Sequence, residues 1–250
     1  AMVAPTPVSA LLHAVAVVKA GVFAILKVTI YVFGIDLVHG TRSTDWLLWV
    51  AAGTIIIASL VALHQDNLKR RLAYSTISQL SYIVMGALLA NASGIIGATL
   101  HIAMHAFGKI TLFFCAGAIL VAAHKTEISE MNGLGRQMPI TMGAFLLASI
   151  SIAGLPPMGG FWGKWYLAFG ALDAGYGVLV GVLMLSTLLN IAYLLPIPIR
   201  AFFSVDRSTT AGITEAPVAC LIAIGVTTTV CLVLFFYPAP ILQLVGPLVR

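Results

Sequence analysis

The sequence predicts an all-α integral membrane protein that crosses the bilayer about seven times. The first observation is composition: 60% of the 250 residues are hydrophobic and only 8% are charged, whereas about a quarter of a soluble domain is charged. The second observation is that the apolar stretches are long and uninterrupted. Such stretches are typical of membrane helices, since the strands of a membrane β-barrel alternate in polarity over roughly ten residues.

Seven apolar segments define the predicted helices, at about twenty residues per crossing. They cover residues 8–33, 46–64, 73–91, 94–123, 139–171, 175–203 and 216–237. Connections rich in Lys and Arg alternate with connections that hold a single arginine, Arg42. The basic connections are 64–73, 124–137 and 200–217, and the others are 33–45, 91–93 and 172–175. Because basic loops stay in the cytoplasm, we expect these three loops and the N-terminus there, with the chain in the cell (inner) membrane.

The net charge of +5 does not indicate a nucleic-acid partner. Its clearest cluster, DNLKRR at 66–71, lies between two apolar segments, as expected of a cytoplasmic loop. An RNA-binding patch would need aromatic platforms or a soluble module beside it. The lipid bilayer is therefore the expected surrounding. Three cysteines, Cys115, Cys220 and Cys231, lie in apolar segments without metal-like spacing, which favours a packing role.

Two predicted segments are irregular. Residues 139–171 are too long for one crossing and contain GLPPMGG at 154–160, including Pro156 and Pro157. Such a sequence breaks a helix, which in transporters marks a binding or conduction site. A loop between two short half-spans is the alternative. Segment 94–123 is also long, so it is expected to tilt or to break locally near Gly108.

Six ionisable residues fall inside predicted spans, where a lysine costs about 2.5–3.5 kcal/mol near mid-bilayer. They are Lys19, Lys27, His101, His105, Lys109 and Lys164. Lys27 lies near a span end, where it can either extend to the interface or serve a function. Lys19, Lys109 and Lys164 lie deeper. Because removal from water penalises the ammonium form, such lysines are suited to exchange protons.

The stretch LHIAMHAFGKITLFF at 100–114 places three titratable groups at successive i,i+4 positions. On a helix, His101, His105 and Lys109 share one face over about 12 Å. Since histidine titrates near neutral pH, this face has the outline of a proton relay.

Other uses of these residues are weighed against the relay. A zinc site on His101 and His105 would need a third ligand, and a Schiff base on Lys164 would need a carboxylate counter-ion. All eight Asp and Glu lie in loops or at span ends, so neither is favoured, and no cofactor or metal is expected. The histidines can also be core residues bonded to neighbouring helices. The buried lysines either find a counter-charge on another chain or a missing part of this one, or stay neutral and hydrated.

A polar stripe marks the third predicted span. Ser75, Ser78, Gln79 and Tyr82 fall at i, i+3, i+4 and i+7 of an otherwise apolar helix, and Asn190 is a weaker case in a later span. Such a stripe either lines a hydrated path or joins helices.

Four motifs together resemble the antiporter-like proton-channel family. They are APTPVSALLHAVAVVKAGVF (4–23), DNLKRRLAYSTISQLSYIVMGA (66–87), LHIAMHAFGKITLFF (100–114) and GLPPMGGFWGKWYL (154–167). The family comprises large membrane subunits of respiratory complex I, Mrp-type sodium/proton antiporters and membrane-bound hydrogenases. Its members have about fourteen helices containing two inverted five-helix repeats, each with one broken helix. The resemblance implies that this sequence is a C-terminal half within a single transmembrane domain over 1–250.

The resemblance assigns a place to each segment. Residues 1–33 would hold the last helix of the first repeat, 46–203 the second repeat and 216–237 a trailing helix. Lys19 would connect the half-channels, His101, His105 and Lys109 would form the central relay, and Lys164 would be the terminal charged residue. The residues expected to support this path are His13, Lys27, Ser75, Gln79, Tyr82, Pro156 and Pro157.

The function implied is proton translocation in a multisubunit cation/proton antiporter, with the Mrp D-type subunit as the nearest resemblance. The alternative is a proton-pumping membrane subunit of NADH-quinone oxidoreductase or of a related hydrogenase, with the redox chemistry in partner subunits. A structural role in such a complex is the third class. The family's buried glutamate has no counterpart in this sequence, so a missing N-terminal half or a partner chain is expected to supply it, beside other membrane subunits.

Overall fold

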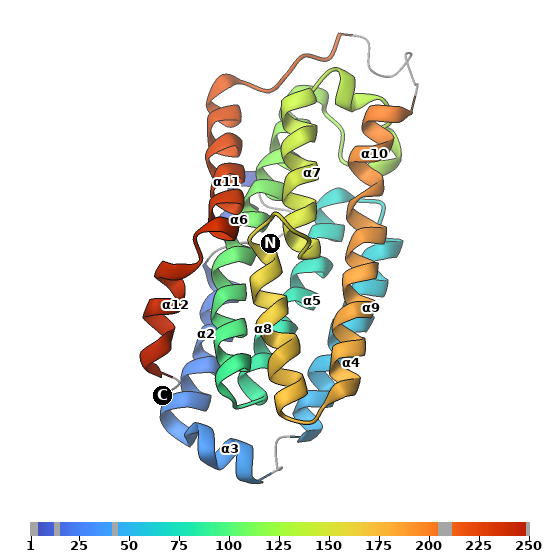
Figure 1. Ribbon diagram of the computed structural model, residues 1–250. Coiled ribbons are helices and arrows are strands. Elements are labelled where there is room, and N and C mark those ends of the chain that lie inside the picture. The colour runs from blue at the N-terminus through green and yellow to red at the C-terminus, as the bar shows by residue number, and fades with distance from the viewer. Residues whose placement is uncertain (1–4, 13–15, 42–44, 205–211, 249–250) are drawn as a thin grey trace.

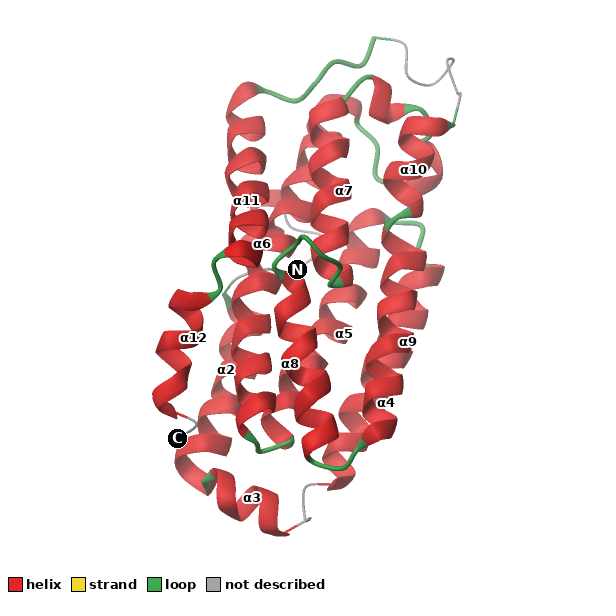
Figure 2. Ribbon diagram, in the orientation of Figure 1, coloured by secondary structure: helices red, strands yellow, loops and turns green. Residues whose placement is uncertain are grey.

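The computed structural model describes residues 5–12, 16–41, 45–204 and 212–248, and throughout these residues the regular structure is helical (Figure 2). The helices are α1 (Thr6–Ala10), α2 (Val17–Lys27), η2 (Val28–Phe33), α3 (Ile35–Thr41), α4 (Asp45–His64), α5 (Leu68–Leu88), α6 (Ala92–Ala123), η3 (Ile128–Glu130), η4 (Leu134–Arg136), α7 (Pro139–Ala153), α8 (Gly160–Asp173), α9 (Gly177–Leu194), α10 (Pro196–Phe203), α11 (Val218–Phe236), α12 (Ala239–Val245) and η5 (Gly246–Leu248).

The long helices run roughly parallel to one another, with their connections gathered at two ends (Figure 1). Four helical stretches within the described residues are long and apolar enough to cross a membrane: α4, α6, α9 with α10, and α11. α6 packs against α5, α7, α8 and α11 and so forms the centre of the bundle. The predicted all-α membrane fold is confirmed.

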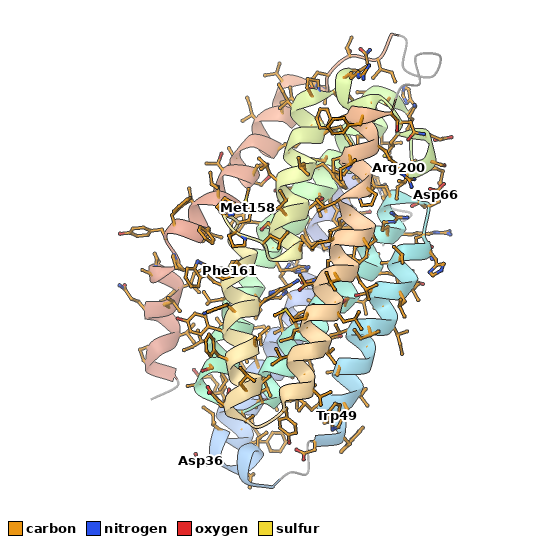
Figure 3. All side chains as sticks on the ribbon, turned by 45° about the vertical axis from the view of Figure 1, so that its right-hand side comes forward. Asp36, Trp49, Asp66, Met158, Phe161 and Arg200 are labelled. Carbon is orange, nitrogen blue, oxygen red and sulfur yellow. The ribbon has the colours of Figure 1, made fainter. Side chains whose placement is uncertain are left out.

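The predicted broken helix is present at residues 154–160. α7 ends at Ala153, where Gly154 takes the left-handed conformation (φ +79°) that favours glycine, and α8 begins at Gly160. Met158 lies within this break (Figure 3). The freed Gly159 amide donates to the Cys231 carbonyl of α11 at 2.9 Å. The neighbouring helix therefore satisfies part of the broken backbone, as a membrane interior requires.

The three basic connections gather at one end of the bundle. Ser129 Oγ donates to Asp66 at 2.6 Å, and the Gly133 amide donates to the Arg200 carbonyl at 3.4 Å. Asp66 and Arg200 lie at this end, whereas Asp36 and Trp49 lie at the other (Figure 3). The alternation of basic and neutral connections therefore corresponds to the two ends of the molecule.

One expected helix start is wrong, and one of the two alternatives for α6 is absent. α5 begins at Leu68 rather than at residue 73, because Asn67 accepts a hydrogen bond from the Arg70 amide at 3.2 Å and caps the helix there. α6 is continuous across Gly108, so the alternative of a local break there is wrong, and that of a tilted helix stays a prediction. A Cβ at Gly108 would lie 2.8 Å from Ile152 Cδ1, so this glycine allows α6 and α7 to approach closely.

Candidate functional site

The three titratable residues of α6 lie on one buried face, as their spacing predicts. His101 and His105 are each 2% exposed and Lys109 is 0% exposed. The two imidazole rings stack with centroids 5.7 Å apart, and the ring of Tyr82 on α5 stacks on His101 at 5.4 Å. A continuous column of three rings therefore runs through the interior towards Lys109.

Lys109 is directed at α5. Its Nζ donates to the Leu72 carbonyl at 3.1 Å and to Ser75 Oγ at 2.7 Å. Ser75 Oγ in turn lies 2.8 Å from the hydroxyl of Tyr193 on α9. The Tyr193 hydroxyl also donates to Asn190 Oδ1. One member of the predicted polar stripe thus contacts the central lysine directly.

Lys164 occupies the start of α8, directly after the helix break. Its Nζ donates to the Ala153 carbonyl at 2.8 Å and to Thr187 Oγ1 on α9 at 3.3 Å. The break leaves the Ala153 carbonyl without its usual helical partner, so the broken helix itself provides the acceptor for this lysine. Lys164 Nζ also lies 5.1 Å from the centre of the Tyr82 ring, within the range of a cation–π contact.

Glycines bring the broken helix against this site. A Cβ at Gly163 would lie 3.0 Å from His101 Cα, and a Cβ at Gly154 would lie 2.7 Å from Lys164 Cδ. Pro156 and Pro157 lie between α7 and α8, where proline cannot continue a helical hydrogen-bond ladder. The GLPPMGG sequence therefore both ends α7 and leaves space for Lys164.

Two further predicted positions lie on α2. Lys19 is 6% exposed, on a helix that packs against α5 and α6. Lys27 is exposed and lies beside the rings of Phe23 and Tyr31, at 5.7 and 6.0 Å. Lys19 is therefore buried within the bundle, whereas Lys27 lies on the surface. His13 lies outside the described residues.

Several interior polar atoms have no hydrogen-bond partner among the described residues. They belong to the side chains of Gln79, Tyr82, His101, His105, Ser151 and Asn190, with Thr6 elsewhere. Buried polar atoms of this kind are normally satisfied by ordered water. This pattern favours a hydrated path over histidines that are already bonded within the core. No Asp or Glu is buried in the part of the chain that the structure describes.

The polar residues on α9 were mostly missed by the sequence reasoning, which singled out only Asn190. Ser186, Thr187, Asn190 and Tyr193 fall at i, i+1, i+4 and i+7, a spacing that places them on one helical face. That periodicity was the available signal. It was weak because α9 is otherwise apolar and Tyr193 lies at its end.

Sequence comparison identifies relatives of part of this chain. NADH-quinone oxidoreductase subunit N of Desulforudis audaxviator (strain MP104C) is 40% identical over 190 residues, which cover 76% of this chain and 37% of that protein. The chain therefore spans little more than a third of the length of this curated relative.

Solved structures share the fold. The Mrp complex from Dietzia sp. DQ12-45-1b contains a chain that matches with a TM-score of 0.81 and 21% identity, covering 92% of this chain and 50% of that one. Respiratory complex I from Thermus thermophilus contains another, also with a TM-score of 0.81 and 21% identity, covering 92% and 49%. At this identity the likeness concerns the fold alone.

The family assignment comes from the sequence over most of the chain. Residues 1–190 match the family described as NADH:quinone oxidoreductase/Mrp antiporter, TM. This region contains the column of rings, the three buried lysines and the broken helix. The protein is therefore a membrane protein that belongs to the NADH:quinone oxidoreductase/Mrp antiporter transmembrane family.

Proposed function

We propose that this chain forms a proton-conducting half-channel within a multisubunit membrane complex. The observation that carries the proposal is Lys109, which is 0% exposed and follows the stacked His101 and His105 on the same face of α6. An amine at this depth is costly unless it serves a function. The unpartnered imidazole nitrogens beside it are suited to accept and release protons through water.

The proposed path connects Lys109 with Lys164. The Lys109 ammonium releases a proton to a nitrogen of His105, which releases a proton from its other nitrogen towards His101. His101 passes a proton on to the neutral amine of Lys164. Each imidazole returns to its neutral form, so one proton moves for each passage. Lys19, which is buried on α2, would connect this path to a second half-channel.

The placement in the family fold is part of the proposal. Residues 1–33 would form the last helix of one repeat, 46–203 the second repeat and 216–237 a trailing helix. The end that carries Asp66 and Arg200 would face the cytoplasm of a cell (inner) membrane. Its support is the gathering of the three basic connections at that end and the preference of basic loops for the cytoplasm.

The complex is proposed to be a cation/proton antiporter or a respiratory quinone oxidoreductase. The resemblance of the motifs favours the D-type subunit of an Mrp antiporter. The relative that is 40% identical is a subunit N of NADH-quinone oxidoreductase, which favours the second assembly. In either case other membrane subunits are the expected partners, and one of them, or a further part of this protein, would supply a buried glutamate.

Replacement of Lys109 tests the half-channel. Lys109→Ala in the intact assembly is expected to abolish proton movement, measured with a pH-sensitive dye in membrane vesicles, because the alanine has no group that binds a proton. Lys125→Ala is the matched control, since Lys125 lies in a connection and donates to the Glu130 carbonyl. Undiminished transport in an assembled Lys109→Ala complex would show that this chain has a structural role instead.

The partners that co-purify with the chain identify the assembly. Iron–sulfur and flavin subunits in the purified complex would show a quinone oxidoreductase, in which oxidation of NADH drives proton movement. Small membrane subunits alone, with proton movement driven by an imposed sodium gradient, would show an antiporter.

A further inference from the structure

One face of α9 is polar although the helix is otherwise apolar. Ser186, Asn190 and Tyr193 on this face are each 0% exposed, and Thr187 lies beside them. Polar side chains buried at membrane depth are found where they bond to other helices or serve a transport path. The path through the two histidines uses none of these four residues.

The α9 face contacts a buried lysine at each of two places. Towards the end that carries the basic connections, Tyr193 lies 2.8 Å from Ser75, which accepts from Lys109 at 2.7 Å. Two turns earlier on α9, Thr187 accepts from Lys164 at 3.3 Å. The α9 face therefore contacts both of the lysines that flank the histidines.

Hydrogen bonds join Lys109 to Asn190 through two hydroxyl groups. Lys109 Nζ donates to Ser75 Oγ. The Tyr193 hydroxyl is within donating distance of both Ser75 Oγ and Asn190 Oδ1. Because a tyrosine hydroxyl carries one hydrogen, it donates to one of these two oxygens at a time, and its own oxygen can accept from Ser75 when the hydrogen lies on Asn190. Lys109, Ser75, Tyr193 and Asn190 therefore form a connected chain whose hydroxyl hydrogens can be directed either way.

Unpartnered polar atoms lie between Tyr193 and Thr187. The Tyr82 hydroxyl lies near Ser186, Thr187 and Asn190 but makes no hydrogen bond to a described residue. Asn190 Nδ2 is buried and likewise unpartnered among the described residues. Donors and acceptors in this arrangement suit one or two bridging water molecules, which need polar partners to be held in a protein interior.

Ser186 has a different part in this region. Its Oγ lies 3.4 Å from Ser59 Oγ on α4, which lies 2.8 Å from Ser78 Oγ on α5. These three hydroxyls join α4, α5 and α9 and reach neither lysine. Ser186 therefore joins α9 to the neighbouring helices. Thr187 contacts Lys164 directly, and Tyr193 contacts Lys109 through Ser75.

We propose that the α9 face is a second proton route between Lys109 and Lys164, parallel to the route through His101 and His105. This inference rests on the proposed half-channel function. The Lys109 ammonium gives a proton to Ser75, and Ser75, Tyr193, bridging water, the Tyr82 hydroxyl and Thr187 each accept one proton on oxygen and release another. Lys164 receives the last proton on its neutral amine. Asn190 is a positioning residue that orients the hydroxyls on either side of it.

The two routes are tested separately by substitutions that remove the proton-exchanging groups of one route and keep side chains of similar size. Tyr193→Phe with Thr187→Val removes two hydroxyls from the α9 route, and His101→Phe with His105→Phe removes the imidazole nitrogens while rings remain. All four substitutions together form the third variant. Tyr74→Phe with Thr99→Val is the matched control, because Tyr74 lies on the partly exposed side of α5 and Thr99 donates to the Ile95 carbonyl of its own helix. Proton movement is measured in vesicles with the intact assembly.

If the two routes are parallel, the loss of proton transport in the combined variant is not the product of the separate losses. We expect each two-residue variant to retain measurable transport, and the four-residue variant to fall to the level of Lys109→Ala, a loss larger than the product of the two separate losses. If the histidine variant alone abolishes transport, or if the combined loss is no larger than that product, the second route is refuted while the half-channel stands. Transport that survives Lys109→Ala refutes the half-channel itself.

Assembly of the variants is verified by co-purification of the partner subunits. If the four-residue variant does not assemble, Tyr193→Phe with His105→Phe replaces it and removes one group from each route. The combined loss of transport is again compared with the product of the two single losses. A combined loss in this pair that equals the product of its single losses overturns the proposal.

Discussion

At the scale of single residues, the helix break depends on Gly154. Its left-handed conformation (φ +79°) disfavours any side chain, and a Cβ there would lie 2.7 Å from Lys164 Cδ. The same residue therefore ends α7 and leaves room for the lysine that follows the break. A change at Gly154 alters the local backbone and the position of a proton carrier together.

Gly154→Val is expected to cost of order 1–3 kcal/mol of folding stability, because a β-branched residue is strained in this conformation. We also expect reduced proton movement, because the valine displaces Lys164 from the Ala153 carbonyl. Thermal unfolding and vesicle transport measure the two effects. Gly143→Val on α7 is the control, since a Cβ at Gly143 meets nothing within 4 Å. Equal effects of the two substitutions would contradict this role of Gly154.

The direction of the Lys109 side chain was not predictable from the sequence. Its i,i+4 spacing from His105 places both residues on one face of α6, which the structure bears out. Spacing along a single helix does not show that Ser75 and the Leu72 carbonyl of α5 hold the amine. That contact depends on how α5 packs against α6, which no local sequence pattern encodes.

At the scale of helices, the contact between α6 and α8 positions the ring column against the broken helix. A Cβ at Gly163 would lie 3.0 Å from His101 Cα, Cβ and Nδ1. The close approach of the two helices therefore needs the absence of a side chain at this position. Small residues commonly allow such approaches between membrane helices.

Gly163→Ala and Gly181→Ala are expected to change stability in opposite directions. An alanine stabilises a helix interior by about 1 kcal/mol relative to glycine, and a Cβ at Gly181 on α9 meets nothing within 4 Å. At Gly163 the added methyl group pushes α8 away from His101, so we expect a lower melting temperature and slower proton movement. The same rise in stability for both variants would contradict the close packing.

The helices themselves were predictable because long apolar segments leave few alternatives. The break at 154–160 followed from two prolines and three glycines at mid-span. The continuity of α6 did not follow, because Gly108 has the same local signal whether it breaks a helix or packs against Ile152. The polar face of α9 was also weakly marked, since its residues acquire their partners from α4, α5 and α8.

At the scale of the whole molecule, the two ends of the bundle differ in their connections. One end holds the loops that contain Asp66, Ser129 and Arg200, joined by hydrogen bonds. At the other end Asn91 Nδ2 donates to the Gly170 carbonyl at 2.7 Å, and Ser93 donates to Asp173 at 3.0 Å. Charge alternation along the sequence was sufficient to sort the connections between these ends.

Thiol labelling measures which end faces the cytoplasm. Thr126 and Ala92 are exposed. Thr126 lies beside Leu68 at the end that carries Asp66, and Ala92 precedes Ser93 at the other end, so a cysteine at either position is accessible to a membrane-impermeant reagent from one side only. We expect Thr126→Cys to react in inverted vesicles and Ala92→Cys in intact cells, with the parent protein as control for its three cysteines. The reverse pattern would contradict the proposed orientation.

The carbonyl that binds Lys164 determines what happens to this side chain when it loses and regains a proton. Its Nζ is held by the neutral Ala153 carbonyl, and no Asp or Glu is buried among the residues that the structure describes. A carboxylate would favour the ammonium form strongly and release the side chain on neutralisation, whereas a carbonyl accepts a hydrogen bond from a charged or a neutral amine alike. Lys164 can therefore lose and regain its proton without changing its place. The broken backbone therefore offers an acceptor to Lys164 in both protonation states, although the hydrogen bond from the ammonium form is the stronger one.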